Sequence, residues 1–513
     1  MSLNLGSLGM EDASFNFGGS YIMALDCGTT SVLATIVDEY GCIVAQARRS
    51  VKTSFPRPGW IEQDPMEVLA SQIGVMMEVQ FKSGIHSDRI AAIGISNQRE
   101  TTVVWDRISG QPIYNAIVWQ CRRTAPLIDE LVERGAEELV RSRTGLTLDP
   151  YFSASKVQWI LDNVDGARES AAAGYLMFAT IDTWLIYNLT GSQVFATDYT
   201  NASRTALFNI HTLDWDDDLL ALFDVPRSMM PEVRWSSGDY GRVASDIMTN
   251  MPPIMGVAGD QQASLFGHCC FHPGQTKNTY GTGCFMLMNT GDEVVESKNG
   301  LVSTIGIAAD GKISYALEGS IFAAGSTMNW LRNNMGIISS VSESAQLAAS
   351  INDNEGCYFV PAFAGLGAPW WDPRARGIVC GLTGASSRAT IVRAACESMA
   401  YQSYDVLRAM EQDVGLSIER LSVDGGASRN EFIMQFQADL LDIPVLQCET
   451  VETTAIGAAY LAGLAVGYWE DLEELEQNAQ IVRTFLPHMS AERREQNLAG
   501  WRDAVKRSLS TAQ

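Results

Sequence analysis

Near its start the chain alternates short apolar runs with polar turns. The runs cover residues 21–25, 32–37 and 42–47, and the turns between them, 26–31 and 38–41, contain glycine and aspartate. The runs are rich in β-branched residues, which favour strands, while glycine and aspartate favour turns. The pattern therefore predicts three consecutive antiparallel strands, the first two joined by a short turn with several hydroxyl groups.

A similar pattern recurs much later in the chain. Residues 275–279 lead into a glycine and threonine turn at 280–283, a second apolar run at 284–288 and a polar turn at 289–292. The two stretches differ in sequence but share one plan of strand, Gly/Thr turn, strand and polar turn. This similarity predicts an ancient duplication in which each half opens on a hairpin.

Helical patterns alternate with short apolar strands elsewhere in the chain. Helices are predicted at 66–79 and 389–410, and strands at 91–96 and 421–423. Strands that alternate with helices form layered α/β folds, whose ligands collect at loops beyond the strand ends. We place the boundary between the halves near 255–268, where no Pro/Ser-rich linker occurs. The halves are therefore predicted to pack closely around a cleft.

The length and charge of the chain narrow its class. Its 513 residues are enough for two or three domains, at roughly 100 to 200 residues each. With 36 Lys and Arg against 60 Asp and Glu, the formal net charge is −24. Such a field repels phosphate polymers and anionic membranes, which argues against nucleic acid or a lipid surface as the main partner. A small anionic ligand would need local backbone donors or a metal ion.

No targeting or membrane segment is predicted. Residues 1–20 lack a basic start and an apolar core, so we interpret them as a flexible tail rather than a signal peptide. The apolar stretch 171–189 is interrupted by polar residues and is too short to span a bilayer.

Ten cysteines without a CxxC pair indicate a reducing, cytoplasmic compartment. The His and Cys group at 268–272 is spaced too tightly for a typical zinc site and is interpreted as the end of a buried helix.

Three glycine turns at predicted strand ends carry the candidate chemistry. In Asp26-x-Gly-Thr-Thr-Ser, amides and hydroxyls can donate to phosphate oxygens while Asp26 holds a hydrated divalent cation. The other two are Gly281-Thr282-Gly283 and the segment 424–427. Each is also typical of an ordinary turn, and the first of a hairpin with a polar tip. The sequence has no P-loop pattern and no His-Arg-Asp catalytic loop.

Together the three turns resemble the phosphate-1, phosphate-2 and adenosine segments of the sugar kinase, Hsp70 and actin superfamily, whose two lobes clamp ATP and Mg²⁺. Within that superfamily the chain resembles the FGGY carbohydrate kinases, above all the members that act on glycerol. The similarity runs from about Tyr21 to about Lys506. The strings that carry it are Asn97-Gln98-Arg99-Glu100-Thr101-Thr102, Trp119-Gln120-Cys121-Arg122-Arg123, the segment 197–204, Gly259-Asp260-Gln261-Gln262, and Tyr151-Phe152-Ser153 through Lys156 and Trp159.

This resemblance implies an α/β fold of two RNase H-like lobes, of the actin and Hsp70 ATPase type, around a central cleft. The N-terminal lobe would span 21–262, with the phosphate-1 turn and the glycerol site. The C-terminal lobe would span 263–513, with the phosphate-2 and adenosine turns. The implied reaction is the first step of glycerol utilisation, in which ATP with Mg²⁺ phosphorylates glycerol to sn-glycerol 3-phosphate and ADP. The resemblance also implies a homo-dimer or homo-tetramer.

Glycerol is a small triol with one apolar edge, so its pocket needs hydroxyl partners and a flat apolar wall. The resemblance assigns polar side chains to the first task and aromatic ones to the second. Without it, Arg99 and Glu100 would be interpreted as a surface ion pair, and Trp119 and Phe285 as core packing. The implied general base is Asp260. The implied glycerol contacts are Arg99, Glu100, Trp119, Tyr151, Asp260, Gln261 and Phe285.

The resemblance also places nucleotide contacts around the three turns, with two departures from the family pattern. Val32 and Leu33 stand where members often have Ser-Arg, which removes a cationic phosphate contact. Asn329 stands where some members have glutamine, which shortens one contact by a methylene. Both changes concern nucleotide affinity rather than the reaction, since Mg²⁺ and the backbone turns still neutralise phosphate charge. The implied contacts are Thr29, Thr30, Ser31, Thr282, Gly325, Asn329, Gly426 and Asn430, with Asp26 as the Mg²⁺ ligand.

Two alternatives stay open from the sequence. One is a related FGGY kinase that acts on another small polyol or ketose, although Trp119 and Phe285 narrow the pocket toward a triol. The other is a nucleotide-binding regulator that kept the fold and lost turnover, which this scaffold allows. The non-catalytic regulator is disfavoured because the chain contains all of the residues that the reaction would need. These are Asp260, Asp26, Arg99 and Glu100.

Overall fold

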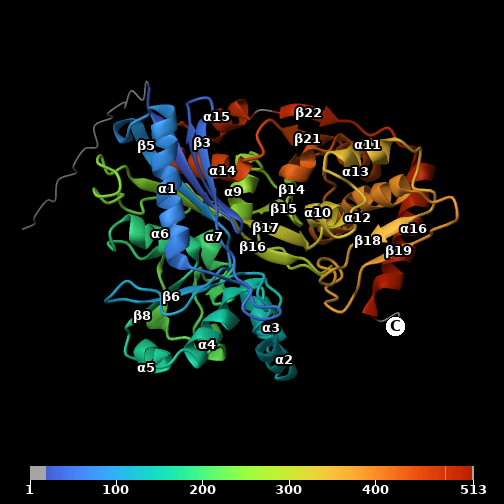
Figure 1. The fold of residues 1–513 in the computed structure, drawn as a ribbon. Helices are drawn as coiled ribbons and strands as arrows, with labels where there is room; N and C mark the ends of the chain where they lie inside the picture. Colours follow the sequence, from blue (N-terminus) through green and yellow to red (C-terminus); the bar gives the residue numbers. More distant parts are fainter. Residues whose placement is uncertain (1–18, 480, 511–513) are drawn as a thin grey trace, which may run out of the picture.

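The computed structural model describes residues 19–479 and 481–510, and two large sheets organise it into two α/β halves (Figure 1). The tail predicted at 1–20 lies outside these residues except for Gly19 and Ser20. No helix in the described ranges is both long and apolar enough to cross a bilayer.

The first sheet has five strands, and its central strand is the first of the chain. β1 runs antiparallel to β2 and β2 antiparallel to β3, which confirms the predicted opening hairpin and its third strand. On the other side, β1 is parallel to β5, and β5 to β13. The strands, in spatial order, are β13 (Ile254–Gly259), β5 (Ile90–Asn97), β1 (Tyr21–Cys27), β2 (Ser31–Val37) and β3 (Ile43–Ser50).

The second sheet repeats this order within a wider set of seven strands. β14 and β15 form the predicted second hairpin, β17 adds antiparallel to β15, and β20 and β21 add in parallel beyond β14. The order β17-β15-β14-β20-β21 thus matches β3-β2-β1-β5-β13, as the predicted duplication requires. The strands are β16 (Val302–Ala309), β17 (Lys312–Ile321), β15 (Cys284–Gly291), β14 (Thr276–Tyr280), β20 (Leu421–Asp424), β21 (Val445–Cys448) and β22 (Ile481–Phe485).

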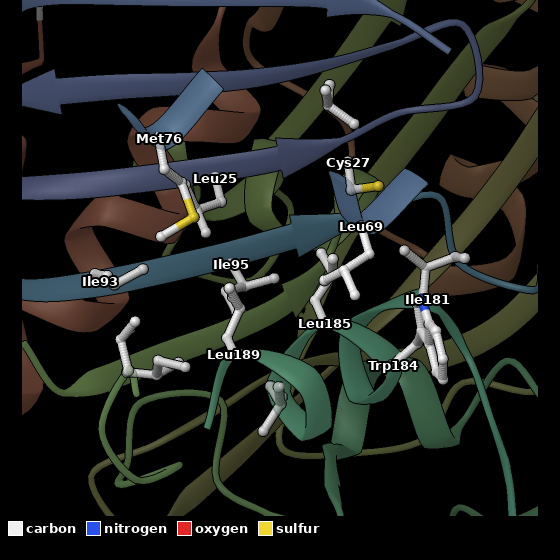
Figure 2. Packing of buried hydrophobic residues seen from close by; sticks show 14 of the residues in the cluster. Leu25, Cys27, Leu69, Met76, Ile93, Ile95, Ile181, Trp184, Leu185 and Leu189 are labelled. Atoms are coloured by element: carbon white, nitrogen blue, oxygen red, sulfur yellow. The ribbon is translucent and has the colours of Figure 1, made fainter. Parts of the chain in front are cut away.

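Helices α1 (Pro65–Ser83) and α6 (Ile181–Leu189) cover one face of the first sheet. Figure 2 shows side chains of both helices meeting those of β1 and β5. The Asp64 side chain accepts the Met66 N–H at the start of α1, and Gly84, at φ 69°, ends it. These signals make α1 longer at both ends than the predicted helix at 66–79.

Helix α14 (Thr453–Ala465) covers the opposite face of the first sheet, although it lies far along the chain. Its small residues allow close approach: a Cβ atom on Gly94 of β5 would lie 2.0 Å from the Ala458 carbonyl oxygen. A Cβ atom on Gly457 would likewise lie 1.8 Å from the Ala263 carbonyl oxygen in α9 (Asp260–Gly267). Residues 453–465 therefore belong to the packing of the first sheet. The predicted lobe boundary between 262 and 263 stays a prediction.

The remaining elements surround these layers. The predicted helix at 389–410 is part of α12, which Ser387 caps at its start and Gly415 ends. The paired short strands are β4 (Glu62–Gln63) with β7 (Ala116–Ile117), β6 (Val103–Asp106) with β8 (Leu176–Ala179), β9 (Ala196–Asp198) with β12 (Glu232–Arg234), β10 (Phe208–Asn209) with β11 (Asp214–Trp215), and β18 (Tyr358–Val360) with β19 (Ile378–Cys380). The other helices are α2 (Ala125–Glu133), α3 (Glu137–Thr144), α4 (Ser153–Asn163), α5 (Ala167–Ala172), α7 (Tyr199–Ala202), α8 (Asp217–Leu222), α10 (Gly325–Asn333), α11 (Glu343–Ala349), α12 (Arg388–Val414), α13 (Glu431–Leu441), α15 (Leu472–Asn478) and α16 (Ala491–Ser508), with short 3-10 turns at Ser87–Arg89, Arg227–Met229 and Gly426–Arg429.

Candidate active site

The first glycine turn joins β1 to β2 at the end of the first sheet. The Gly28 N–H donates to the Ser31 carbonyl (3.0 Å), and Thr29, Thr30 and Ser31 are all at least partly exposed. The Thr29 hydroxyl accepts a hydrogen bond from Trp119 Nε1 (2.9 Å). The turn predicted to bind phosphate therefore contacts an aromatic residue predicted to bind glycerol.

A row of side chains crosses the first sheet beside this turn. The strand register pairs Ser96 with Asp26, Asp26 with Leu33, and Leu33 with Arg48. Residues that face each other across neighbouring strands share one face of the sheet. Asp26, the predicted metal ligand, therefore lies on the same face as Leu33 and Arg48. Leu33 stands where family members often have an arginine, and Arg48 is a different arginine on the next strand.

Arg48 supplies a cation near the turn, where the sequence predicted that one is lost. Its guanidinium donates to the Ser31 hydroxyl (3.0 Å) and to the Glu452 carboxylate (2.6 Å). The side chain is 47% exposed. The charge missing at Leu33 is thus present one strand further along the same row.

Asp26 has the environment of a carboxylate that gains from a bound cation. Burial raises the pKa of Asp26 to about 7; the carboxylates of Asp260 and Glu452 add to the rise, while a hydrogen bond from Ser96 and the charge of Arg48 lower it. A cation beside the group would favour its ionised form. Mg²⁺ needs only one or two carboxylates when phosphates and waters complete its shell, so Asp26 fits the predicted role. Within the described ranges, no group of three or more His, Cys, Asp or Glu side chains could hold a metal ion.

The second glycine turn, between β14 and β15, is fastened to the start of α10. The Thr282 carbonyl accepts hydrogen bonds from the Ala324 and Ser326 N–H groups (3.0 and 3.1 Å). A Cβ atom on Gly325 would lie 2.6 Å from the Gly281 carbonyl oxygen, so a larger residue would force these segments apart. The predicted contacts Thr282 and Gly325 are therefore neighbours in the structure.

The third turn packs against the strand that precedes the second. Gly425 has a φ of +85°, and a Cβ atom there would lie 2.6 Å from the Tyr280 carbonyl oxygen, so the position requires glycine. Gly426 follows it and is exposed, as is Asn329 on α10. The Asn430 side chain caps α13 by accepting a backbone N–H (3.3 Å). Asn430 therefore has a structural role whatever it contributes to a ligand.

Three aromatic side chains from separate segments meet near Arg99. The Trp119 ring centroid lies 5.4 Å from that of Tyr151 and 6.1 Å from that of Phe285, both edge-on. The Tyr151 hydroxyl accepts from Arg99 Nη2 (3.2 Å), and Arg99 Nε lies 3.2 Å from Asp260 Oδ1. The structure thus brings together five of the predicted glycerol contacts.

The other two predicted glycerol contacts lie beside this set with partners of their own. Glu100 Oε1 accepts from Arg204 Nε (2.7 Å), while Arg99 Nε is 3.8 Å from the same oxygen. The Gln261 side-chain oxygen accepts from Lys277 Nζ. Arg99 and Glu100 are both 2% exposed, so they are a buried pair and not the surface ion pair of the alternative interpretation.

A carboxylate from the second sheet fixes these arginines. Glu318 on β17 accepts from both Arg99 and Arg204 (3.0 Å each), and all three side chains are almost fully buried. Burial opposes the ionised form of Glu318, but the two arginines outweigh it and lower the pKa of Glu318 to about 2. The sequence did not predict a role for Glu318, and Arg204 was part of the segment 197–204 that resembles the family but had no predicted role. One signal in the sequence could have indicated this role: Glu318 is a single acidic residue in an otherwise apolar strand. Buried acidic residues are normally paired with a cation.

Asp260 is the first residue of α9, directly after β13. Its Oδ1 accepts the Gln261 N–H (2.7 Å), yet 28% of the side chain remains exposed. Burial raises the pKa of Asp260 to about 6, although the charges of Arg99 and Lys277 oppose this rise. Most molecules therefore carry an ionised, accessible carboxylate here at neutral pH.

One buried ammonium group holds the loop that carries Tyr151. Lys156 Nζ donates to the carbonyls of Pro150 (2.6 Å), Tyr151 (2.7 Å) and Phe152 (2.9 Å). The side chain is fully buried, which lowers the pKa of Lys156 to about 7. The position of the Tyr151 ring therefore depends on a residue that does not itself face the site.

The two sheets have matching strand order, and each has a glycine turn after its central strand. This arrangement defines a two-lobed α/β fold of the actin and sugar kinase type. Comparison with known families narrows the class. Residues 21–267 match the N-terminal domain of the FGGY family of carbohydrate kinases, and residues 276–466 match its C-terminal domain. The chain belongs to the FGGY family of carbohydrate kinases.

The similar proteins match over almost their whole length. Glycerol kinase 1 of Clostridium tetani is 56% identical over 490 residues, 96% of this chain and 98% of the relative. Glycerol kinase 2 of Thermotoga maritima is 55% identical over 489 residues, 95% of this chain and 99% of the relative. The crystal structure of Plasmodium falciparum glycerol kinase with ADP is 36% identical with a TM-score of 0.89, covering 96% of this chain and 98% of that one. These matches confirm the predicted family and the two-lobed α/β fold.

Proposed function

We propose that the protein phosphorylates glycerol with ATP, forming sn-glycerol 3-phosphate and ADP. The observation that carries this proposal is the meeting of Trp119, Tyr151 and Phe285 beside Arg99 and Asp260. The rings offer flat apolar surfaces to the C–H edge of a small triol, and the charged groups offer partners to its hydroxyls. The glycerol kinases that are 55% and 56% identical over nearly the whole chain support the same assignment.

In the proposed reaction, Asp260 takes the proton from the glycerol hydroxyl that attacks the γ-phosphorus of ATP. A new bond forms between that oxygen and phosphorus, and the bond to the bridging oxygen of ADP breaks, so ADP leaves with the electron pair. Arg99 orients the Asp260 carboxylate, and the Tyr151 hydroxyl contacts another hydroxyl of glycerol. Glu100 and Gln261 complete the set of polar contacts.

The three glycine turns would hold the nucleotide. Thr29, Thr30 and Ser31 would contact phosphate oxygens from the first half, and Thr282 from the second. Asp26 would bind Mg²⁺ through water, and the ion would neutralise phosphate charge. Gly325, Asn329, Gly426 and Asn430 would lie on the adenosine side.

Arg48 replaces, in this proposal, the phosphate contact that Leu33 cannot make. Its guanidinium already donates to Ser31 in the first turn (3.0 Å). A nucleotide phosphate would compete with the Glu452 carboxylate for the same donors. Arg48 therefore restores part of the nucleotide affinity that the Val32-Leu33 departure removes.

The substrate panel that tests the function compares glycerol with xylulose, ribulose and gluconate, using purified protein, Mg-ATP and substrate-dependent ADP release. We expect glycerol to react much faster than the others. Preferential turnover of a five- or six-carbon substrate would reject the glycerol assignment in favour of a related FGGY kinase. Nucleotide binding without turnover of any substrate would favour the non-catalytic regulator.

We further propose a cytoplasmic homo-dimer or homo-tetramer whose lobes divide near residues 262 and 263. No disulfide bond joins the cysteines of the described residues, which supports a reducing compartment. The N-terminal family match ends at residue 267 and the C-terminal match begins at residue 276, which supports a division in this region. Light scattering of the purified protein measures the oligomeric state directly.

A further inference from the structure

Cys448, His268 and Asp424 form a line of side chains outside the proposed active site. Cys448 Sγ lies 3.1 Å from His268 Nδ1, and His268 Nε2 lies 3.6 Å from Asp424 Oδ1. The imidazole and carboxylate are at most 1% exposed, and among the described residues neither of their facing atoms has a hydrogen-bond partner. The three residues come from the ends of β21, α9 and β20, so the fold brings them together.

A cavity of about 900 Å³ opens beside this line, and both Cys448 and His268 line its wall. Cys448 is half-buried, and the cavity is the route by which a small molecule would reach it. None of the predicted glycerol, nucleotide or metal residues lines this cavity. The charged side chains in its wall are Arg420 and Arg429 on the positive side, and Glu449, Glu452 and Glu476 on the negative side.

The neighbours of His268 favour its charged form. Burial opposes that form, but the Cys448 sulfur and the Asp424 carboxylate outweigh it and raise the pKa of His268 to about 10. An imidazolium in contact with a thiol stabilises the thiolate, which is the reactive form of cysteine. The glutamates of the cavity wall act in the opposite direction, but His268 is the group in hydrogen-bond contact with the sulfur.

We propose that Cys448 is a modification site, at which a thiolate stabilised by His268 forms mixed disulfides with low-molecular-weight disulfides that enter the cavity. Cys448 Sγ attacks one sulfur of the incoming disulfide, the S–S bond breaks, and the other half leaves as a thiolate with the electron pair. The disulfide is itself the oxidant, so the step needs no other reactant. His268, predicted to lie at the end of a buried helix, directly follows α9 and contacts Cys448 from a distant strand.

The test follows mixed-disulfide formation on each cysteine of the native full-length protein. The protein is incubated with oxidised glutathione at neutral pH, quenched with acid at intervals and analysed by peptide mass spectrometry. Cys380 is the internal control, because it is also half-buried and the neighbours that influence it among the described residues are Arg507, Asp503 and Tyr358, with no imidazole. We expect Cys448 to react about tenfold faster than Cys380 or more, as thiolate character predicts.

The variant His268→Gln separates thiolate activation from simple accessibility. It should slow Cys448 to about the rate of Cys380 while leaving Cys380 unchanged. Equal rates for the two cysteines in the wild-type protein would overturn the proposal, as would an unchanged Cys448 rate in folded His268→Gln protein. Where that variant does not fold, the wild-type comparison decides alone. The result is independent of whether glycerol is the substrate.

Discussion

The two hairpins at the centres of the two sheets share a backbone plan but differ in charge. Counted back from the first glycine of each turn, Asp26 in β1 corresponds to Thr279 in β14. Asp26 is a carboxylate with a raised pKa, whereas Thr279 accepts a hydrogen bond from the buried ammonium of Lys277 (2.9 Å). The first hairpin therefore suits a bound cation, while the second contains one of its own.

The turns differ in how they are held. The first, at 28–31, presents hydroxyls and contacts Trp119 and Arg48 through side chains. The second, at 281–283, is tied by backbone hydrogen bonds to the start of α10, and Gly425 packs on Tyr280 just before it. Duplication of a scaffold thus fixes where ligand groups gather, while the charges that face the ligand diverge between the copies.

The largest effect is expected from Glu318→Gln, which removes the charge that the second sheet contributes to Arg99 and Arg204. The loss of one partner from a buried ion network should lower the free energy of unfolding by about 3–5 kcal/mol. It should also raise KM for glycerol, because Arg99 loses its fixed position. Urea denaturation and steady-state kinetics measure the two effects.

The matched control for this prediction is Glu397→Gln. Glu397 is another buried acid, paired with Arg393 on α12. Its loss should destabilise the fold while leaving KM for glycerol unchanged. A Glu318→Gln protein with normal KM for glycerol would show that the link between the sheets is structural only.

Asp260→Asn should lower kcat by about 10²-fold or more, the usual scale for losing a general base. The amide preserves size and much of the contact with the Gln261 N–H, so the fold and Mg-ATP binding should survive. Stopped assays for kcat and calorimetry for the nucleotide check both statements. Near-normal turnover in a well-folded variant would exclude Asp260 as the base and direct attention to Glu100.

Arg48→Gln should weaken ADP binding about 3- to 10-fold without changing glycerol affinity, since it removes a partly exposed, charged phosphate partner. Glu452→Gln should change ADP affinity in the opposite direction, because it frees the Arg48 guanidinium. Arg49→Gln is the control: Arg49 is equally exposed and pairs with Glu78 instead. If Arg48→Gln and Glu452→Gln both weaken ADP binding, the Arg48–Glu452 ion pair supports the local structure only. That outcome would contradict a direct contact between Arg48 and a nucleotide phosphate.

The smallest effect concerns pH. A base with a pKa of about 6 must be ionised to accept a proton, so its activity is complete well above that pH and falls as the pH decreases through it. We expect kcat/KM to halve near pH 6 and to fall about tenfold per unit well below it. A profile of kcat/KM for glycerol between weakly acid and neutral pH measures this limb. The residual activity of Asp260→Asn should lack it.

The strands and the family strings were predictable because their signals are local. Alternation and glycine turns define β1, β2, β14 and β15, and Arg99 lies within a continuous string of site residues. Glu318 and Arg48 were not predictable in the same way, because their roles depend on strand register and on packing between sheets. Arg48 matters because of the residue opposite it, Leu33, which the sequence separates from it by a turn. Cross-sheet partners of this kind are set by tertiary structure.

The packing of α14 on the first sheet has a consequence for synthesis of the chain. One face of that sheet is covered by α1 and α6, which lie between its strands in the sequence, whereas the other face is covered by residues 453–465. A ribosome makes the first half long before these residues emerge. Until residues 453–465 have been synthesised, one apolar face of the first sheet therefore stays uncovered. A fragment that stops at residue 262 would keep this face exposed to solvent and would be prone to aggregate.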